Sequence, residues 1–142
     1  MDERKSYHFI VIEDSKLDCF ICEKIIQSLG PACASLNMFI NALEGLEYIR
    51  TLEDSSNTIL LVDIQMPIMS GFEFIEAFES MVPAEEQGNF IVNILSSSTN
   101  EKDISKAFSY DSVYKFMHKP LRKQMLEDLL KELETGDPNL MK

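Results

Sequence analysis

Ile59 to Gly71, with the sequence Ile-Leu-Leu-Val-Asp-Ile-Gln-Met-Pro-Ile-Met-Ser-Gly, is the stretch that decides the fold. Its first four residues are apolar and predict a buried strand, because the run is too short for a helix. Asp63 follows directly, at the point where such a strand would reach the surface. Pro67 then ends regular structure, since proline lacks an N–H group and disfavours a helical residue before it. The stretch therefore predicts one carboxylate at the end of a buried strand, followed by a stiffened loop.

The rest of the chain alternates between strand patterns and helix patterns. Strands are expected at about residues 8–12, 34–39, 59–62, 90–95 and 113–117, and each is followed by apolar residues at helical spacing. The segment 83–89 is expected to be a polar loop. Alternating strands and helices imply a parallel sheet with helices on both faces. We therefore expect one doubly wound α/β domain over residues 1–142, with five helices, a core from about 8 to 134 and a short flexible tail at 135–142.

Composition narrows the classes of function. The chain has 142 residues and a net charge of −11, which opposes nonspecific binding to nucleic acid or to anionic lipid. No apolar run approaches the roughly 20 residues that a membrane helix needs, and the charged start does not resemble a signal peptide. Three cysteines, an odd number, indicate a reducing compartment, and we expect a cytoplasmic protein. Cys19 and Cys22 form a C-x-x-C pair without a second pair, so they are interpreted as structural residues and not as a zinc site.

The expected topology brings polar residues from several strand ends together, because ligands of doubly wound sheets bind beyond the carboxyl ends of the strands. If the first and third strands are neighbours, Glu13, Asp14 and Asp63 converge. Clustered carboxylates cost free energy unless a cation joins them or some are protonated. An oxygen-only site suits Mg²⁺, with Ca²⁺ and Mn²⁺ next in preference. Beside such a cation Asp63 could accept a phosphoryl group, with Lys119 and Ser96 contacting its oxygens.

These residues carry a resemblance to a known family. Glu13-Asp14, Asp63, Met66-Pro67 with Gly71, Ser96 and Lys119-Pro120 occur in this order, each at an expected strand end or in the loop behind it. In this pattern the chain resembles the receiver domain of two-component response regulators, over about residues 8–134. The resemblance implies a flavodoxin-like sheet with strand order 2-1-3-4-5. It also implies that a histidine kinase or phosphotransfer protein donates a phosphoryl group to Asp63.

The resemblance assigns further roles to individual residues. It implies that Mg²⁺ is held by Glu13, Asp14, Asp63 and the backbone carbonyl of Gln65. Lys119 matches the lysine that the family places before a cis-proline. The switch hydroxyl falls on Ser96, although the serine run leaves Ser97 open as an alternative. The aromatic switch of the family falls on Phe116.

The expected function is a stand-alone signalling module, because about nine residues follow Leu133 and leave no room for an output domain. Output is expected through a changed protein-binding surface on the fourth helix, fifth strand and fifth helix, in a monomer or a phosphorylation-dependent dimer. Such a protein is a switch that gains and loses a phosphoryl group, and not a turnover enzyme. Two alternatives remain. One is a phosphorylation-independent interaction module with the same fold. The other is an aspartate-nucleophile phosphatase of the haloacid-dehalogenase kind, whose Asp-x-Asp motif is missing after the first strand.

Overall fold

The computed structural model describes residues 5–136 and contains one five-stranded parallel sheet. Its strands are β1 Tyr7–Ile12, β2 Cys33–Phe39, β3 Thr58–Val62, β4 Phe90–Ser96 and β5 Val113–His118. Their order across the sheet is β2-β1-β3-β4-β5, and all four pairings are parallel. The order that the resemblance implied is therefore confirmed.

Within residues 5–136 six α-helices flank this sheet, one more than the sequence predicted. They are α1 Lys16–Gln27, α2 Ala42–Thr51, α3 Gly71–Met81, α4 Ala84–Gln87, α5 Glu101–Phe108 and α6 Lys123–Thr135, with a 3₁₀ turn at Gly30–Ala32. The additional helix, α4, is a single turn inside the segment predicted to be a loop. Its N–H groups at Glu86 and Gln87 both donate to the carbonyl of Pro83. The predicted fourth and fifth helices are thus α5 and α6.

The last helix, α6, ends close to the predicted end of the core. Helix α6 ends at Thr135, the first residue of the expected tail. Residues 137–142 of the expected tail and the charged start at 1–4 lie outside the described residues. Between residues 5 and 136, no helix is both long enough and apolar enough to cross a membrane.

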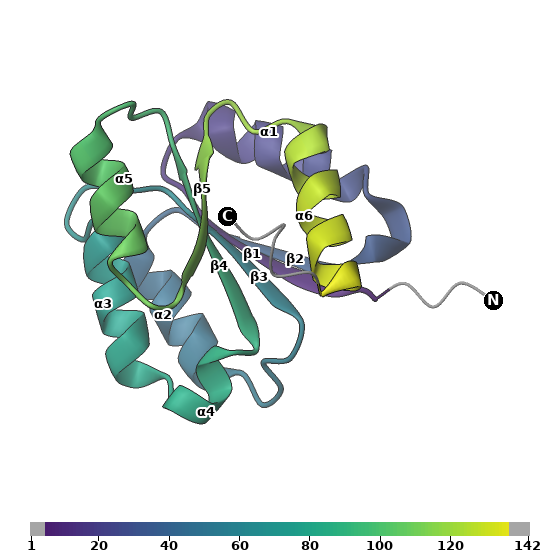
Figure 1. The fold of residues 1–142 in the computed structure, drawn as a ribbon, viewed down its shortest axis with the longest axis horizontal. Helices are drawn as coiled ribbons and strands as arrows, with labels where there is room; N and C mark the ends of the chain where they lie inside the picture. Colours follow the sequence, from purple (N-terminus) through teal and green to yellow (C-terminus); the bar gives the residue numbers. More distant parts are fainter. Residues whose placement is uncertain (1–4, 137–142) are drawn as a thin grey trace.

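The helices form two layers, one on each face of the sheet (Figure 1). One layer, α2, α3 and α5, packs against a core that includes the buried side chains of Ile10, Leu60, Phe74 and Phe78. The other, α1 and α6, packs against a core that includes Phe9, Leu61, Ile26 and Leu129. Strand β3 lies in the middle of the sheet, and all five of its residues are buried. This explains why it reads as a continuous apolar run, since a parallel strand is covered on both faces.

The register of β1 and β3 places the polar strand ends side by side. Ile12, the last residue of β1, is opposite Val62, the last residue of β3. The backbone N–H of Asp63 donates to the carbonyl of Ile12 at 3.0 Å, so the pairing extends one residue beyond the strand. Glu13 and Asp63 therefore start their loops at the same edge of the sheet.

Candidate phosphoryl and metal site

Three carboxylates meet at this edge, beyond β1 and β3. Glu13, Asp14 and Asp63 each place one oxygen in a group whose members all lie within 4.8 Å of one another. Glu13 and Asp63 are buried, with 1% and 6% of their surface exposed, while Asp14 is exposed. Two buried carboxylates and one that reaches solvent form a cluster open on one side, where a cation or a phosphoryl donor could approach.

The loop after β3 fixes the orientation of Asp63. The backbone N–H of Gln65 donates to Oδ1 of Asp63 at 3.3 Å, and the N–H of Gly71 donates to the carbonyl of Ile64 at 2.9 Å. Helix α3 then begins with a capping box, in which Ser70 and Glu73 satisfy each other's backbone N–H groups. Hydrogen bonds therefore fix the loop both near Asp63 and at the start of α3, and they keep Asp63 at the end of β3.

Lys119 reaches the same cluster from the end of β5. Its ammonium nitrogen lies 2.7 Å from Oε1 of Glu13, 2.8 Å from Oδ2 of Asp18 and 3.6 Å from Oδ1 of Asp63. Its backbone N–H donates to the carbonyl of Ser96, and the Lys119-Pro120 peptide bond is cis. The ammonium therefore sits at the edge of the acidic cluster, bound to two carboxylates and close to a third.

Burial and charge shift the pKa values of this cluster. Burial raises the pKa of Glu13 to about 7, opposed by its hydrogen bonds from Lys119 and from the N–H of Ser15 and reinforced by the charge of Asp63. Burial also raises the pKa of Asp63, although Lys119 works in the opposite direction. Desolvation would lower the pKa of Lys119, but hydrogen bonds to Asp18 and Glu13 raise it overall. The cluster is therefore short of positive charge, despite Lys119.

The residues expected to act as switches lie on β4 and β5. Ser96 is buried, with 1% of its surface exposed, whereas Ser97 is exposed. The Ser96 hydroxyl accepts the N–H of Ser98 at 3.0 Å. Phe116 is half-buried against the core under α3 and α5, and its ring centroid lies 5.2 Å from that of His118. Of the two serines that the sequence left open, Ser96 is the one that β4 carries at its end.

Comparison with known proteins identifies the family. Residues 9–131 match the response regulator receiver domain. The chain belongs to this family. Among solved structures, a response regulator receiver protein from Dyadobacter fermentans is 29% identical with a TM-score of 0.79, covering 89% of this chain and 97% of that one. A two component response regulator from Cytophaga hutchinsonii is 25% identical with a TM-score of 0.83, covering 93% and 99%.

The chain also resembles a short part of a much longer curated protein. A probable histidine kinase 1 from Oryza sativa subsp. indica is 30% identical over 74 residues. That match covers 50% of this chain but only 7% of the relative, so the chain spans a small part of that protein's length. The similarity therefore concerns a receiver-like segment and not the relative as a whole.

The carboxylates of this receiver domain fit a magnesium ion. Receiver domains generally depend on Mg²⁺, and Glu13, Asp14 and Asp63 offer only oxygen atoms, which Mg²⁺ prefers. Burial raises the pKa values of Glu13 and Asp63, and a divalent cation bound there would offset the cost of burying these carboxylates in their charged form. Gln65, the fourth expected ligand through its carbonyl, follows Asp63 in the same loop.

Asp18 is a site residue that the sequence did not reveal. Its position three residues after Ser15 is one that an acidic residue of a capping box occupies, and the Ser15 hydroxyl accepts the N–H of Asp18 at 3.3 Å. The Asp18 carboxylate instead pairs with Lys119, which lies 101 residues away in sequence. No local signal marks such a contact, because it depends on how α1 and β5 are placed in the fold.

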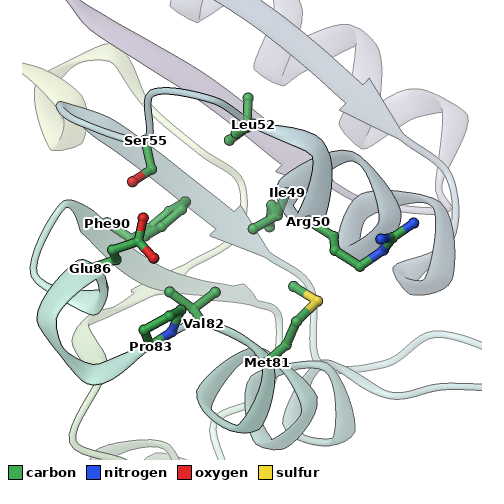
Figure 2. Close-up of a pocket in the computed structure, with 9 residues that line it drawn as sticks. All are labelled: Ile49, Arg50, Leu52, Ser55, Met81, Val82, Pro83, Glu86 and Phe90. Carbon is green, nitrogen blue, oxygen red and sulfur yellow. The ribbon is translucent and has the colours of Figure 1, made fainter.

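A small pocket lies away from this site, at the opposite end of the strands (Figure 2). It is formed by the ends of α2 and α3 together with α4 and the start of β4, and its lining includes Ile49, Met81, Val82 and Phe90. None of the expected site residues lines it. This pocket and the edge that carries Asp63 are therefore separate features of the domain.

Proposed function

We propose that this receiver domain accepts a phosphoryl group on Asp63, from a phosphorylated histidine of a partner kinase or phosphotransfer protein, and requires Mg²⁺ to do so. The observation that carries the proposal is the convergence of Glu13, Asp14 and Asp63 within 4.8 Å, with Lys119 held 3.6 Å from Asp63. The ammonium beside the acidic cluster supports a phosphoryl site, because phosphoryl oxygens carry negative charge that must be balanced.

In the proposed reaction an oxygen of Asp63 forms the new O–P bond while the P–N bond of the phosphohistidine breaks. The bond electrons remain on the departing imidazole, which takes up a proton. Bound Mg²⁺ would neutralise charge on the phosphoryl oxygens. Lys119 would contact one of these oxygens with its free N–H, and the Ser96 hydroxyl would donate to another after leaving the N–H of Ser98. The protein thus supplies a preoriented nucleophile and hydrogen-bond donors.

We propose that the signal leaves through the surface of α5, β5 and α6. Lys119 directly follows β5, and Phe116 lies on the same strand, so a shift of the ammonium toward a phosphoryl group acts on this strand. Strand β5 is an edge strand of the sheet and is covered on only one side by β4. A partner could therefore read its position directly. The domain would act as a two-state switch and not as a turnover enzyme.

We also propose that the protein is located in the cytoplasm. Cys19, Cys22 and Cys33 are free thiols, which agrees with the reducing cytoplasm expected from the sequence. A cytoplasmic location would also give the domain access to the kinase modules from which the phosphoryl group would come.

The decisive experiment is phosphorylation by acetyl phosphate with and without Mg²⁺. We expect acid-stable, base-labile phosphate on the wild type with Mg²⁺, and none in Asp63→Asn. Asp111→Asn is the matched control, because Asp111 is an exposed aspartate before β5 and lies outside the acidic cluster. It should be labelled like the wild type. Equal labelling of Asp63→Asn and wild type would refute the proposed acceptor.

The same experiment addresses the two alternatives. Steady release of phosphate from unrelated monoesters would favour an aspartate-nucleophile phosphatase. Absence of labelling by acetyl phosphate and by a cognate kinase, with partner binding retained, would favour a phosphorylation-independent module.

A further inference from the structure

Asp18 has a carboxylate that its own helix does not use. It is the third residue of α1 after the cap Ser15, where an acidic side chain often turns back to the N–H of the capping residue. Here that N–H is already taken, because Ser15 donates to Oε2 of Glu13 at 3.1 Å. The Asp18 carboxylate points across to β5 and accepts from the Lys119 ammonium at 2.8 Å.

The contacts of Lys119 divide into two kinds. Glu13, at 2.7 Å, and Asp63, at 3.6 Å, both belong to the acidic cluster that would hold a cation. Asp18 does not belong to that cluster, and 25% of its side chain is exposed. An ammonium has three N–H donors and moves on a flexible stem. Lys119 can therefore stay bound to Asp18 while it releases the other two carboxylates.

This release matters because an ammonium and a divalent cation compete for the same oxygens. When a cation approaches Glu13 and Asp63, it repels Lys119 and takes over its partners. With Asp18 present, the ammonium keeps one charged partner outside the cluster. Without that partner, its close anions among the described residues are Glu13 and Asp63, and it opposes the cation more strongly.

We infer that Asp18 is a positioning residue, which holds Lys119 at the edge of the acidic cluster so that a divalent cation can bind there. The inference rests on the proposed Mg²⁺ site, and it concerns the metal affinity of the domain before any phosphoryl transfer. It assigns to Asp18 a role in the site although Asp18 touches neither the cation nor the phosphoryl group.

The test is calorimetric titration of the full chain with MgCl₂, supported by thermal unfolding to show that each variant is folded. Asp18→Asn keeps the shape of the side chain and removes its charge. We expect it to bind Mg²⁺ about fivefold more weakly than the wild type, which corresponds to about 1 kcal/mol. Glu23→Gln is the matched control, since it removes one negative charge from the same helix, outside the cluster. It should change the affinity less than about twofold.

Repeating the Mg²⁺ titration in a Lys119→Met variant distinguishes a role of Asp18 in positioning Lys119 from a general effect of its charge. Lys119→Met should bind Mg²⁺ more tightly than the wild type, because the competing ammonium is gone. In that background, adding Asp18→Asn should leave the affinity unchanged, since Asp18 acts only through Lys119. The same weakening in both backgrounds would overturn the inference, and so would wild-type affinity in Asp18→Asn.

The outcome also separates this inference from the proposed function. Mg²⁺ binding that is lost in Asp63→Asn but unaffected by Asp18→Asn would refute the role of Asp18 and leave the proposed site standing. No saturable Mg²⁺ binding by the wild type would refute both.

Discussion

The carbonyl oxygen of Asp63 lies where Gly71 leaves no room for a side chain. A Cβ atom at position 71 would be 2.3 Å from that oxygen and 2.8 Å from the Cα of Ile64. Both neighbours are backbone atoms, so they cannot move aside as a side chain could. The first turn of α3 therefore packs directly on the backbone at the end of β3, where Asp63 lies. Glycine at this position is what lets the loop close.

We predict that Gly71→Ala lowers the free energy of unfolding by about 2–3 kcal/mol, because the new methyl group forces the backbone of Asp63 to shift. Urea unfolding measures this change. Gly88→Ala is the control, since no atom lies within 4 Å of a Cβ at that position. It should be neutral or slightly stabilising. Equal stability of the two variants would contradict the steric argument.

Glu13 makes the stability of the metal-free domain depend on pH. Its pKa rises from 4.5 to about 7 on folding, chiefly through burial. Between these values the folded state holds more protons than the unfolded state, so the free energy of unfolding falls as pH rises. One pKa unit corresponds to about 1.4 kcal/mol, so we expect a loss on the order of 3 kcal/mol across this window.

Glu13→Gln isolates this contribution, because glutamine resembles the protonated acid at every pH. We predict that the variant and the wild type have similar stability near the acid end of the window. Near about pH 8 the variant should be more stable when metal is absent. Saturating Mg²⁺ should then stabilise the wild type at about pH 8 and have little effect at about pH 5, where Glu13 is protonated. A stability difference that does not vary with pH would rule out this account.

The sequence predicted the sheet well because its strands are buried on both faces. The run from Ile59 to Val62 is continuous and apolar for that reason, and Asp63 marks its end without ambiguity. Fixing the end of each strand was enough to bring Glu13, Asp63 and Lys119 to one edge. Strand order itself came from the family resemblance, since no residue pattern in a single sequence specifies which parallel strands are neighbours.

The sequence was less informative about which helix residues are buried against the sheet. Leu17, Leu43 and Phe108 belong to the apolar residues at helical spacing, yet 68%, 54% and 52% of their surfaces are exposed. Helical spacing groups such residues on one side but does not show how wide the covered stripe is. The pairing of Asp18 with Lys119 and the burial of Glu132 were missed for a related reason. Both depend on neighbours from distant elements, and an acidic residue in a helix gives no sign of them.

Glu132 stabilises the contact between α6 and the edge strand β5. Only 8% of its surface is exposed, and it forms an ion pair with Lys115 and accepts the hydroxyl of Tyr114 at 3.1 Å. We predict that Glu132→Ala lowers the free energy of unfolding by about 2 kcal/mol, because two polar groups lose their partner. Glu127→Ala changes an exposed residue of the same helix and should cost less than about 0.5 kcal/mol. Similar midpoints of urea unfolding for both variants would disprove this role.

Ile68 is strained by the loop that follows Asp63. Its φ angle is 71°, a left-handed conformation that is unfavourable for a β-branched residue, and 90% of its surface is exposed. No packing therefore compensates for the strain. We predict that Ile68→Asn raises the free energy of unfolding by about 1 kcal/mol, because asparagine tolerates this conformation.

Ile40→Asn is the matched control for this last prediction. Ile40 is also exposed, at 65%, but it is not among the described residues with a positive φ angle. The control should therefore show no gain in thermal or urea unfolding. Labelling by acetyl phosphate should proceed in Ile68→Asn as in the wild type, since the side chain at this position points into solvent. An equal gain in stability from both substitutions would mean that removing an exposed apolar group, and not relief of backbone strain, is responsible.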